Sequence, residues 1–548
     1  MNRTHLLSTL SVLCLLSACA GANPTPSSKP AESSSVETSG AVTSSEAPSG
    51  IVTSSEESSS EATSGAVSSS SQATSSVTPS SSAQPSSSVQ PSSSAQPSSS
   101  SAKPSSSAVP SSSSSAPKPA ALDPYAEPKL GQQYYLNHIG DIFSAWKQYT
   151  GKGVTIAVID MGFKPTHEDF YFKDGTSKVT ANSASFTTTG NNTVTAVGAD
   201  KVVNLGESHG TFCAGVAAAA ANGKGVIGVA PDANLMLLKT DRKPKSIAAA
   251  FRYAADNGAK VITISIGSYY YEYIGDLVDD GSDLATVFNA PVQYCLNKGV
   301  TVVSAAGNGG EMGEDWVTEY TFPGATPGVI GVGGLAANKS TEIWSGSSYN
   351  SSPAYQFVDV VAPANGMYGC CHYDGKDYDG GWNGTSFASP IVAGMAALYY
   401  EANPTHTPAQ FEAALYNSCV SFTPDGGKPA KNQIGKGRVD VGRLLGISVS
   451  SSIAVTCVNS RWTNCYCYAW NSVTGTALSS WPGKAMSKSS STYTYTIPAG
   501  YDSVIFNNGS GQQSPDLLVS SLSGARYNLS TYASLSSSVQ IGSYTKVA

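Results

Sequence analysis

Charged residues are scarce in this chain: Lys, Arg, Asp and Glu make up 13% of its 548 residues, and the formal net charge is −7 at pH 7. We find no basic stripe and no long run of like charges, which argues against nucleic acid as a partner. Beyond the N-terminal segment, no apolar run is long enough to cross a bilayer. These absences argue against a nucleic-acid-binding protein and against a protein with several membrane spans.

Several motifs are missing as well. There is no G-x-S-x-G sequence, which argues against an esterase of the α/β-hydrolase type. No cysteine pair has zinc-finger spacing, and the vicinal Cys370-Cys371 and the C-x-C at 465–467 are weak metal signals. Eight cysteines follow Cys19. Many disulfide pairings are compatible with that number, so the connectivity stays open.

The N-terminus carries export signals. Arg3 is followed by a short apolar run and then by small residues, which is typical of a signal peptide. Leu16-Ser17-Ala18-Cys19 resembles a bacterial lipobox. We therefore predict a lipoprotein-type signal peptide over residues 1–19, and an exported chain anchored through a lipid on Cys19 to the outer membrane or cell surface. The alternative is ordinary secretion with Cys19 removed.

Residues 20–121 consist almost entirely of Ser, Ala, Pro, Thr and Val, with repeats such as "QPSSSVQPSSSAQ". This stretch lacks the large apolar side chains that would offset the entropy of ordering. We predict a long disordered linker.

Between residues 122 and 447, short apolar runs alternate with amphipathic ones. Strand candidates are "VTIAVID", "ANLMLLK", "KVITISIG", "VTVVSAAGN" and "GVIGVGG", and helix candidates are "TFCAGVAAAAAN", "SIAAAFRYAADNG", "LATVFNAPVQYCLNKG" and "SFASPIVAGMAALYYEAN". This alternation predicts an α/β domain with a parallel sheet covered by helices on both faces. In such sheets the functional residues gather where the strands end.

Three polar residues occupy such positions. Asp160 closes the first apolar run, and His209 and Ser386 each open a helical run. A serine becomes a nucleophile when an imidazole takes its proton, and a carboxylate holds that imidazole in the right tautomer. Asn308 ends another strand candidate, where its amide can donate to the oxyanion together with the Ser386 backbone N–H. The alternative interpretation is that these residues have only structural roles: Ser386 as an N-cap, and Asp160 and Asn308 as turn residues.

With these four residues in view, the region resembles the subtilisin-like serine proteases (subtilases, peptidase family S8). The motifs are "VTIAVIDMG", "HGTFCAG", "AAGNGG" and "GTSFASP", in the family's order of Asp, His and Ser. The resemblance implies that Asp160, His209 and Ser386 are catalytic and that Asn308 lies in the oxyanion hole. It further implies substrate-binding segments at Ser265-Ile266-Gly267 and Ala305-Ala306-Gly307.

The family resemblance also bears on metals and maturation. No cofactor is expected for the chemistry. Asp169, with Gln132 or Gln133, matches ligands of a structural calcium site, although the remaining ligands are not evident. The linker runs almost into the catalytic domain and leaves no room for a folded pro-domain, which many subtilases have.

From residue 453 to 548 the pattern changes to short strand-like runs, which predicts an all-β sandwich. This part resembles family 26 starch-binding modules through "NCYCYAWNS", "WPGKAM" and "FNNGSGQQSPDL". The resemblance implies a sugar site lined by Tyr466, Tyr468, Trp470, Trp481 and Gln512 or Gln513. The alternative is that half of these aromatics belong to the core, since one face of each sheet in a sandwich is buried. Residues 525–548 are unassigned.

The sequence as a whole predicts an exported serine endopeptidase that acts on proteins or peptides, is held near starch or a related α-glucan by its C-terminal module, and is a monomer. The rival interpretation is a catalytically inactive surface protein, an adhesin that only binds carbohydrate.

Overall fold

The computed structural model describes residues 122–269, 284–314, 316–352, 356–447, 451–532 and 540–547. The predictions for the signal peptide, for Cys19 and for the linker lie outside the described residues. No helix in the described part of the chain has the length and apolarity needed to span a membrane.

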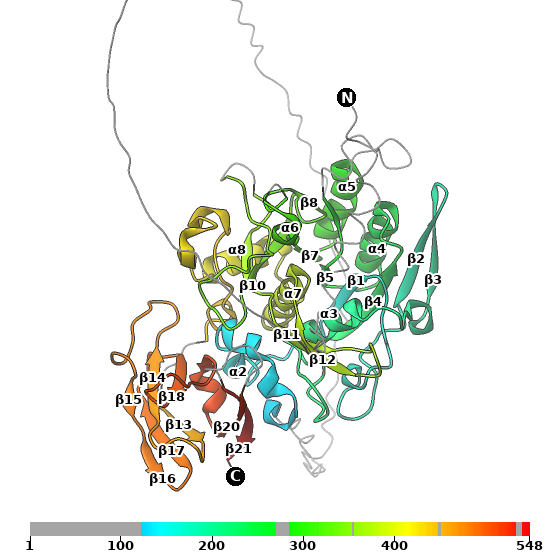
Figure 1. The fold of residues 1–548 in the computed structure, drawn as a ribbon. Helices are drawn as coiled ribbons and strands as arrows, with labels where there is room; N and C mark the ends of the chain where they lie inside the picture. Colours follow the sequence, from blue (N-terminus) through cyan, green and yellow to red (C-terminus); the bar gives the residue numbers. More distant parts are fainter. Residues whose placement is uncertain are drawn as a thin grey trace, which may run out of the picture. The chain divides into compact units, whose positions relative to one another are not determined.

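An eight-stranded sheet forms the centre of the larger part, in the order β10-β9-β7-β5-β1-β4-β2-β3 (Figure 1). Neighbouring strands are parallel except for β2 and β3, which form an antiparallel hairpin at one edge. The strands are β1 Thr155–Asp160, β2 Ala184–Thr189, β3 Asn192–Val197, β4 Asn234–Thr240, β5 Val261–Ile264, β7 Thr301–Ala305, β9 Val329–Leu335 and β10 Val360–Pro363.

Helices cover both faces of this sheet. Because side chains alternate along a strand, Ile156 and Val158 of β1 join one apolar core while Ala157 and Ile159 join the other. The first core is shared with α3 and α7, and the second with α4 and α5. The helices are α2 Ile142–Ala145, α3 His209–Ala218, α4 Pro244–Asp256, α5 Leu284–Asn297, α6 Gly309–Met312, α7 Thr385–Ala402, α8 Pro408–Ser418 and α9 Val441–Leu444. The predicted fold class is confirmed.

Two short ribbons flank the sheet. In one, β6 Ser268–Tyr269 pairs with β8 Thr321–Phe322, and in the other, β11 Met367–Cys370 pairs with β12 Tyr378–Trp382. The second ribbon packs against α3: a methyl group built on Gly215 would lie 2.6 Å from Cys370 Sγ. Neither ribbon is evident from the sequence pattern.

The C-terminal part is a β-sandwich. One sheet has the order β16-β17-β13-β20-β21 and the other β15-β14-β18-β19. The strands are β13 Ile453–Val458, β14 Tyr466–Trp470, β15 Lys484–Ala485, β16 Ser487–Ser489, β17 Thr492–Ile497, β18 Ser503–Asn507, β19 Leu517–Leu518, β20 Ala525–Tyr532 and β21 Gln540–Lys546. The unassigned C-terminal residues therefore supply two strands of the larger sheet.

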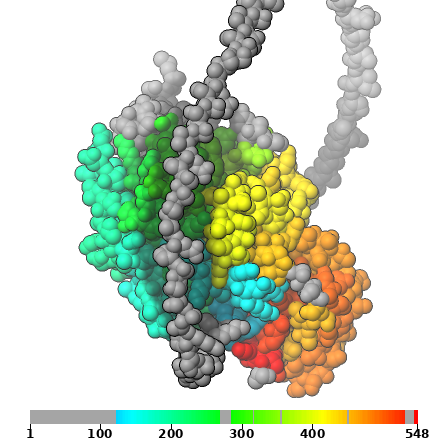
Figure 2. All heavy atoms as spheres, turned by 180° about the vertical axis from the view of Figure 1, so that it is seen from behind, coloured from blue at the N-terminus to red at the C-terminus, as the bar shows by residue number. Residues whose placement is uncertain are grey.

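The sandwich contacts the N-terminal residues of the described chain. Tyr125 Oη donates to Ser521 O at 2.7 Å, Leu518 N donates to Asn137 Oδ1 at 3.3 Å, and Lys546 pairs with Asp123 at 2.8 Å. Figure 2 shows this neighbourhood as red atoms beside cyan ones. The boundaries of 122–447 and 453–548 stay a prediction, with residues 448–450 between them outside the described part.

Candidate active site

Asp160 and His209 meet at the end of β1. His209 Nδ1 lies 3.0 Å from Asp160 Oδ1 and 2.9 Å from Oδ2, and both side chains are buried. A carboxylate only accepts, so the ring proton resides on Nδ1 and the lone pair on Nε2. Asp160 Oδ1 also accepts from Met161 N at 2.8 Å, which fixes the carboxylate. The pair has the arrangement that a general base requires.

A glycine allows this close approach of α3 to β1. A methyl group on Gly210 would lie 2.4 Å from Gly162 O and 2.9 Å from Asp160 Cβ. Any larger residue after His209 would therefore push the helix, and the imidazole with it, away from Asp160.

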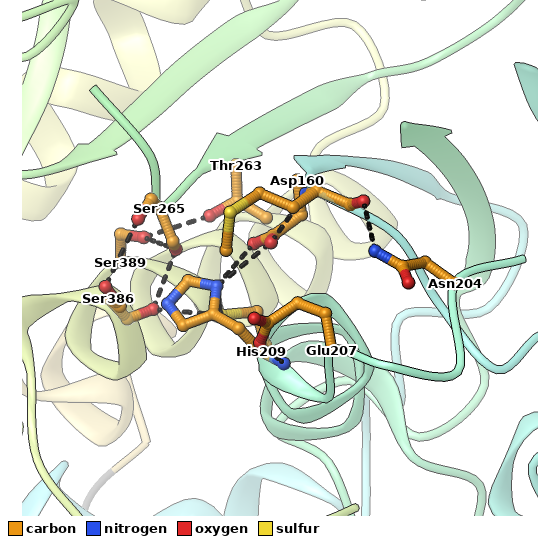
Figure 3. A network of polar contacts seen from close by, with 10 residues as sticks. Asp160, Asn204, Glu207, His209, Thr263, Ser265, Ser386 and Ser389 are labelled. Atoms are coloured by element: carbon orange, nitrogen blue, oxygen red, sulfur yellow. Dashed lines mark hydrogen bonds and ion pairs between the residues drawn. The ribbon is translucent and has the colours of Figure 1, made fainter. Parts of the chain in front are cut away.

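Ser386 is the second residue of α7, and its helix is capped by Gly384. The interpretation of Ser386 as an N-cap is therefore wrong. Its Oγ donates to Ser265 O at 3.2 Å, and its carbonyl accepts from Ser265 Oγ at 2.7 Å and from Cys213 Sγ at 3.3 Å. Figure 3 shows the His209 ring between Asp160 and this first turn of α7.

Asn308 follows β7 by three residues and immediately precedes α6. Its Oδ1 accepts from both the backbone N (3.0 Å) and the Oγ1 (2.9 Å) of Thr385. Because these two bonds hold Oδ1 on Thr385, Nδ2 points away from the Thr385 hydroxyl. A methyl group on Gly384 would lie 3.4 Å from Asn308 Nδ2 and 3.6 Å from Ser386 Oγ, so both groups border one small space.

A cavity of about 20 Å³ opens next to Ser386. Five of the six predicted substrate-binding residues line it, namely Ser265, Ile266, Gly267, Ala305 and Gly307. Ala306 does not: it is fully buried, and its carbonyl accepts from Thr321 Oγ1 at 2.8 Å. Thr321 and Phe322 of β8 also line the cavity. Neither residue is predictable from the sequence, since a two-residue strand leaves no periodic signal.

Cys213 lies one helical turn after His209, and its side chain contacts the imidazole. Its Sγ is 4.0 Å from His209 Nδ1 and is fully buried. Burial raises the pKa of this thiol, which keeps it protonated. All eight cysteines of the described residues are free, buried thiols.

The residues predicted to hold calcium differ in their exposure and in their contacts. Gln132 is exposed. Gln133 is buried, but its amide is engaged with Ile227 N (2.9 Å), Ile227 O (2.7 Å) and Tyr135 Oη (2.6 Å). Asp169 Oδ2 accepts from Val226 N at 3.0 Å, and the neighbouring side chains are His167 and Cys370. Calcium requires six to eight oxygen ligands, and a calcium ion at Asp169 stays a prediction.

The predicted sugar-binding aromatics lie on the outer face of β14. Tyr466, Tyr468 and Trp470 are partly exposed, whereas the alternating Cys467 and Ala469 are buried in the sandwich core. Tyr468 has ring contacts with Trp470 (centroids 5.8 Å apart) and with Trp481 (5.3 Å), and Trp481 is 50% exposed. The three strand aromatics therefore lie outside the core.

The two glutamines differ in their surroundings. Gln512 Oε1 accepts from Trp462 Nε1 at 3.1 Å and from Asn508 Nδ2 at 3.2 Å, so this amide supports the loop. Gln513 forms a β-bridge with Asn507, the residue paired with Tyr466. Gln513 is therefore separated from β14, the strand that carries the aromatics, by β18.

Models of known families match both the α/β part and the C-terminal sandwich. Residues 151–439 match the model of the subtilase family, and residues 455–518 match the model of starch-binding module 26. A crystal structure of fervidolysin from Fervidobacterium pennivorans, described as a keratinolytic enzyme related to subtilisin, covers 70% of this chain and 56% of its own, with 22% identity and a TM-score of 0.47.

Curated relatives match the larger part of the chain. Subtilisin NAT of Bacillus subtilis subsp. natto is 32% identical over 277 residues, which are 50% of this chain and 62% of that protein. A subtilisin of Bacillus pumilus is 33% identical over 277 residues, which are 50% of this chain and 86% of that protein. Thermitase of Thermoactinomyces vulgaris is 31% identical over 296 residues, which are 53% of this chain and 89% of that protein. The chain spans about three-fifths of the length of the first of these relatives. The family model matches more than half of the chain, and the chain therefore belongs to the subtilase family.

Proposed function

We propose that the protein is a serine endopeptidase that cuts proteins near α-glucan, to which its C-terminal module binds. The observation that carries the catalytic part is the buried Asp160–His209 pair beside Ser386. The binding part is supported by the partly exposed aromatics of β14 and the match to a starch-binding module.

In the proposed reaction, Ser386 Oγ attacks the peptide carbonyl while His209 Nε2 accepts its proton. Asp160 stabilises the imidazolium that forms, through the two contacts at Nδ1. Because Ser386 Oγ donates to Ser265 O in this conformation, the hydroxyl turns toward His209 before the attack. His209 then protonates the leaving amine, and water hydrolyses the acyl-enzyme by the same route.

The oxyanion of the tetrahedral intermediate would be stabilised by Asn308 Nδ2 and by the Ser386 backbone N–H. Thr385 holds Asn308 by its Oδ1, so the amide is oriented before substrate arrives. Such preorganised donors stabilise the transition state without a reorganisation cost. Segments 265–267 and 305–307 would hold the substrate on the pocket side of the nucleophile.

Proteolysis is tested with an unfolded protein substrate, whose fragments are identified by mass spectrometry. The wild-type chain should cut at internal peptide bonds, and the matched Ser386→Ala variant should not. Fragments from exclusively terminal positions would refute the endopeptidase assignment. Equal cleavage by both variants would exclude Ser386 as the nucleophile.

Sugar binding would use Trp481 with Tyr468 and Trp470, since aromatic faces stack on sugar rings, and Gln513 would bond sugar hydroxyls. Trp481→Ala should lower the fraction of protein that sediments with insoluble starch and leave cleavage of a soluble substrate unchanged. Thr496→Ala is a control in the same module, because Thr496 is an exposed residue of β17, in the other sheet of the sandwich. Equal sedimentation of the wild type and Trp481→Ala would contradict the assigned sugar site.

Export, a lipid on Cys19 and a monomeric state complete the proposal. The lipid would hold the enzyme at the outer membrane or cell surface, with residues 20–121 as a spacer. Cys19→Ala should move the protein from the membrane fraction to the medium. Light scattering of a chain without its linker should give the molar mass of a single chain. An unchanged distribution between the fractions would contradict the anchor.

A further inference from the structure

A chain of buried hydroxyl groups leads from the central sheet to the start of α7. Thr263 lies in β5, Ser265 follows that strand directly, and Ser389 lies one helical turn after Ser386. Thr263 Oγ1 is 3.2 Å from Ser389 Oγ, which is 3.0 Å from Ser265 Oγ. Ser265 Oγ in turn is 2.7 Å from Ser386 O. Figure 3 shows these four residues beside the His209 ring.

The local structure brings the three hydroxyl groups together. Residues two apart in an extended segment face the same side, so Thr263 and Ser265 both point toward α7. Residues three apart on a helix are neighbours, so Ser389 lies on the same face of α7 as Ser386. Ser265 is 7% exposed, and Thr263 and Ser389 are fully buried. Water therefore does not compete for the hydrogen bonds of Ser389.

A proline explains why the chain ends on the carbonyl of Ser386. In an α-helix this oxygen would accept from the backbone N–H four residues later, but that residue is Pro390, which has no N–H. The oxygen accepts instead from Ser265 Oγ and, at 3.3 Å, from Cys213 Sγ. The backbone of the nucleophile is thus bonded to the end of β5.

The direction of each hydrogen bond in the chain follows from its last acceptor. A carbonyl only accepts, so the single hydroxyl proton of Ser265 points to Ser386 O. Ser265 Oγ therefore accepts from Ser389 Oγ, and Ser389 Oγ accepts from Thr263 Oγ1. Three O–H groups are aligned toward one carbonyl, and hydrogen bonds aligned in this way strengthen one another.

Ser265 joins this chain to the segment 265–267, which holds the substrate in the proposed function. Its backbone carbonyl also accepts from Ser386 Oγ at 3.2 Å. We propose that Thr263 and Ser389 are positioning residues of the protease, which act through Ser265 to fix the nucleophile relative to the substrate-binding segment. Neither of the two lines the cavity beside Ser386. Their role rests on the proposed function and extends it to residues that do not touch the substrate.

Loss of either hydroxyl should slow the reaction. Valine has the branching of threonine but no hydroxyl, so Thr263→Val removes the donor to Ser389, and Ser389→Ala removes the donor to Ser265. A misplacement of about 1 Å costs about 10²-fold in rate, and a weakened chain should displace Ser386 by less than that. We expect each substitution to lower kcat about 10-fold. KM should stay within about 2-fold of the wild-type value.

Two further variants separate positioning from stability. Thr263→Ser keeps the hydroxyl and removes only a methyl group, so it should retain the wild-type kcat even where it unfolds at a lower temperature. Thr301→Val makes the same change as Thr263→Val on β7, where Thr301 Oγ1 lies 2.6 Å from Tyr400 Oη of α7. Tyr400 is about four helical turns from Ser386, so this variant should lose stability and keep its kcat.

The test measures the rate constant of labelling of the full chain by a fluorophosphonate probe in excess. Well below the unfolding temperature, this rate constant is set by the active site and not by the stability of the fold. Thr263→Val and Ser389→Ala should each be labelled about 10-fold more slowly than the wild type. The double variant should be labelled no more slowly than Ser389→Ala, because both changes interrupt the same chain. Thr263→Ser and Thr301→Val should match the wild type.

The outcomes distinguish this role from the proposed function itself. Labelling of Thr263→Val within about 2-fold of an active wild type, an equal loss for Thr301→Val, or losses that multiply in the double variant would each overturn the positioning role. A folded wild-type chain that is not labelled and does not cleave protein would instead contradict the proposed function.

Discussion

Gly384 offers a severe test of the proposed oxyanion site. It caps α7 with a φ of +149°, and its α-carbon borders the space between Asn308 and Ser386. The substitution Gly384→Ala would place a methyl carbon 3.4 Å from Asn308 Nδ2 and 3.6 Å from Ser386 Oγ. In the proposed mechanism, the oxyanion occupies this space when Ser386 attacks.

The size of the effect follows from what the methyl group obstructs. An oxyanion must come within about 2.7–3.1 Å of its donors, and loss of one such donor from a subtilisin costs about 2.7–4 kcal/mol, or a factor of about 10²–10³ in kcat. The methyl group would hold the substrate oxygen away from Asn308, so Gly384→Ala should lower kcat at least ~100-fold. The unfavourable φ should also lower folding stability by about 1–3 kcal/mol.

A second glycine separates these two effects. Gly258, after α4, has a φ of +90°, and a methyl group built on it meets no atom within 4 Å. Gly258→Ala should thus show the loss of stability without a loss of activity. The assay is the steady-state cleavage of a fluorescently quenched protein substrate, with unfolding followed in parallel. Gly384→Ala activity within about 3-fold of the wild type, or an equal loss for Gly258→Ala, would show that the oxyanion does not occupy the space beside Gly384.

Two further predictions concern stability and specificity. Burial, reinforced by Arg438, lowers the pKa of His138 to about 4. The unfolded chain therefore binds a proton near pH 6.5 that the folded chain takes up only near pH 4, and stability should fall by about 3 kcal/mol as the pH drops through that range. His138→Gln should remove most of this slope in urea unfolding at pH 7 and pH 4, and equal slopes would contradict it. Thr321 fills one side of the cavity of about 20 Å³ beside Ser386. Thr321→Gly should shift cleavage toward bulkier residues before the cut bond, as mass spectrometry of fragments would show, and an unchanged cleavage pattern would count against this role.

Much of the fold was predictable because its strands are continuous apolar runs. The run "VTIAVID" became β1, and "SFASPIVAGMAALYYEAN" became α7 with a shift of one residue at each end. The helix predicted over 211–222 ends four residues early, at Ala218. There Ala219 O accepts from Gly228 N and Ala220 N donates to Asp169 O, so tertiary hydrogen bonds replace the helical ones.

The candidate site was predictable where local motifs mark strand ends, and less so where packing decides. Asp160, His209, Asn308 and Ser386 each lie at the end of a strand or the start of a helix, and they come together because the parallel strands end at one edge of the sheet. Thr321 reaches the cavity through a pairing of two residues, β6 with β8, which carries no periodicity.

The expectation of calcium at Asp169 illustrates a second limit. A motif fixes the residue but not its neighbours in space, and here the neighbours are His167 and Cys370, the latter contributed by a distant ribbon. Only the folded chain shows that.

Activation of Ser386 by His209 can be measured with a fluorophosphonate probe, because such a probe reacts with activated serines. The wild-type chain should be labelled at Ser386, while Ser386→Ala, His209→Ala and the denatured wild type should not. Absence of labelling in a folded wild type, or equal labelling of His209→Ala, would contradict the account. It would then favour the rival interpretation, a surface protein that only binds carbohydrate.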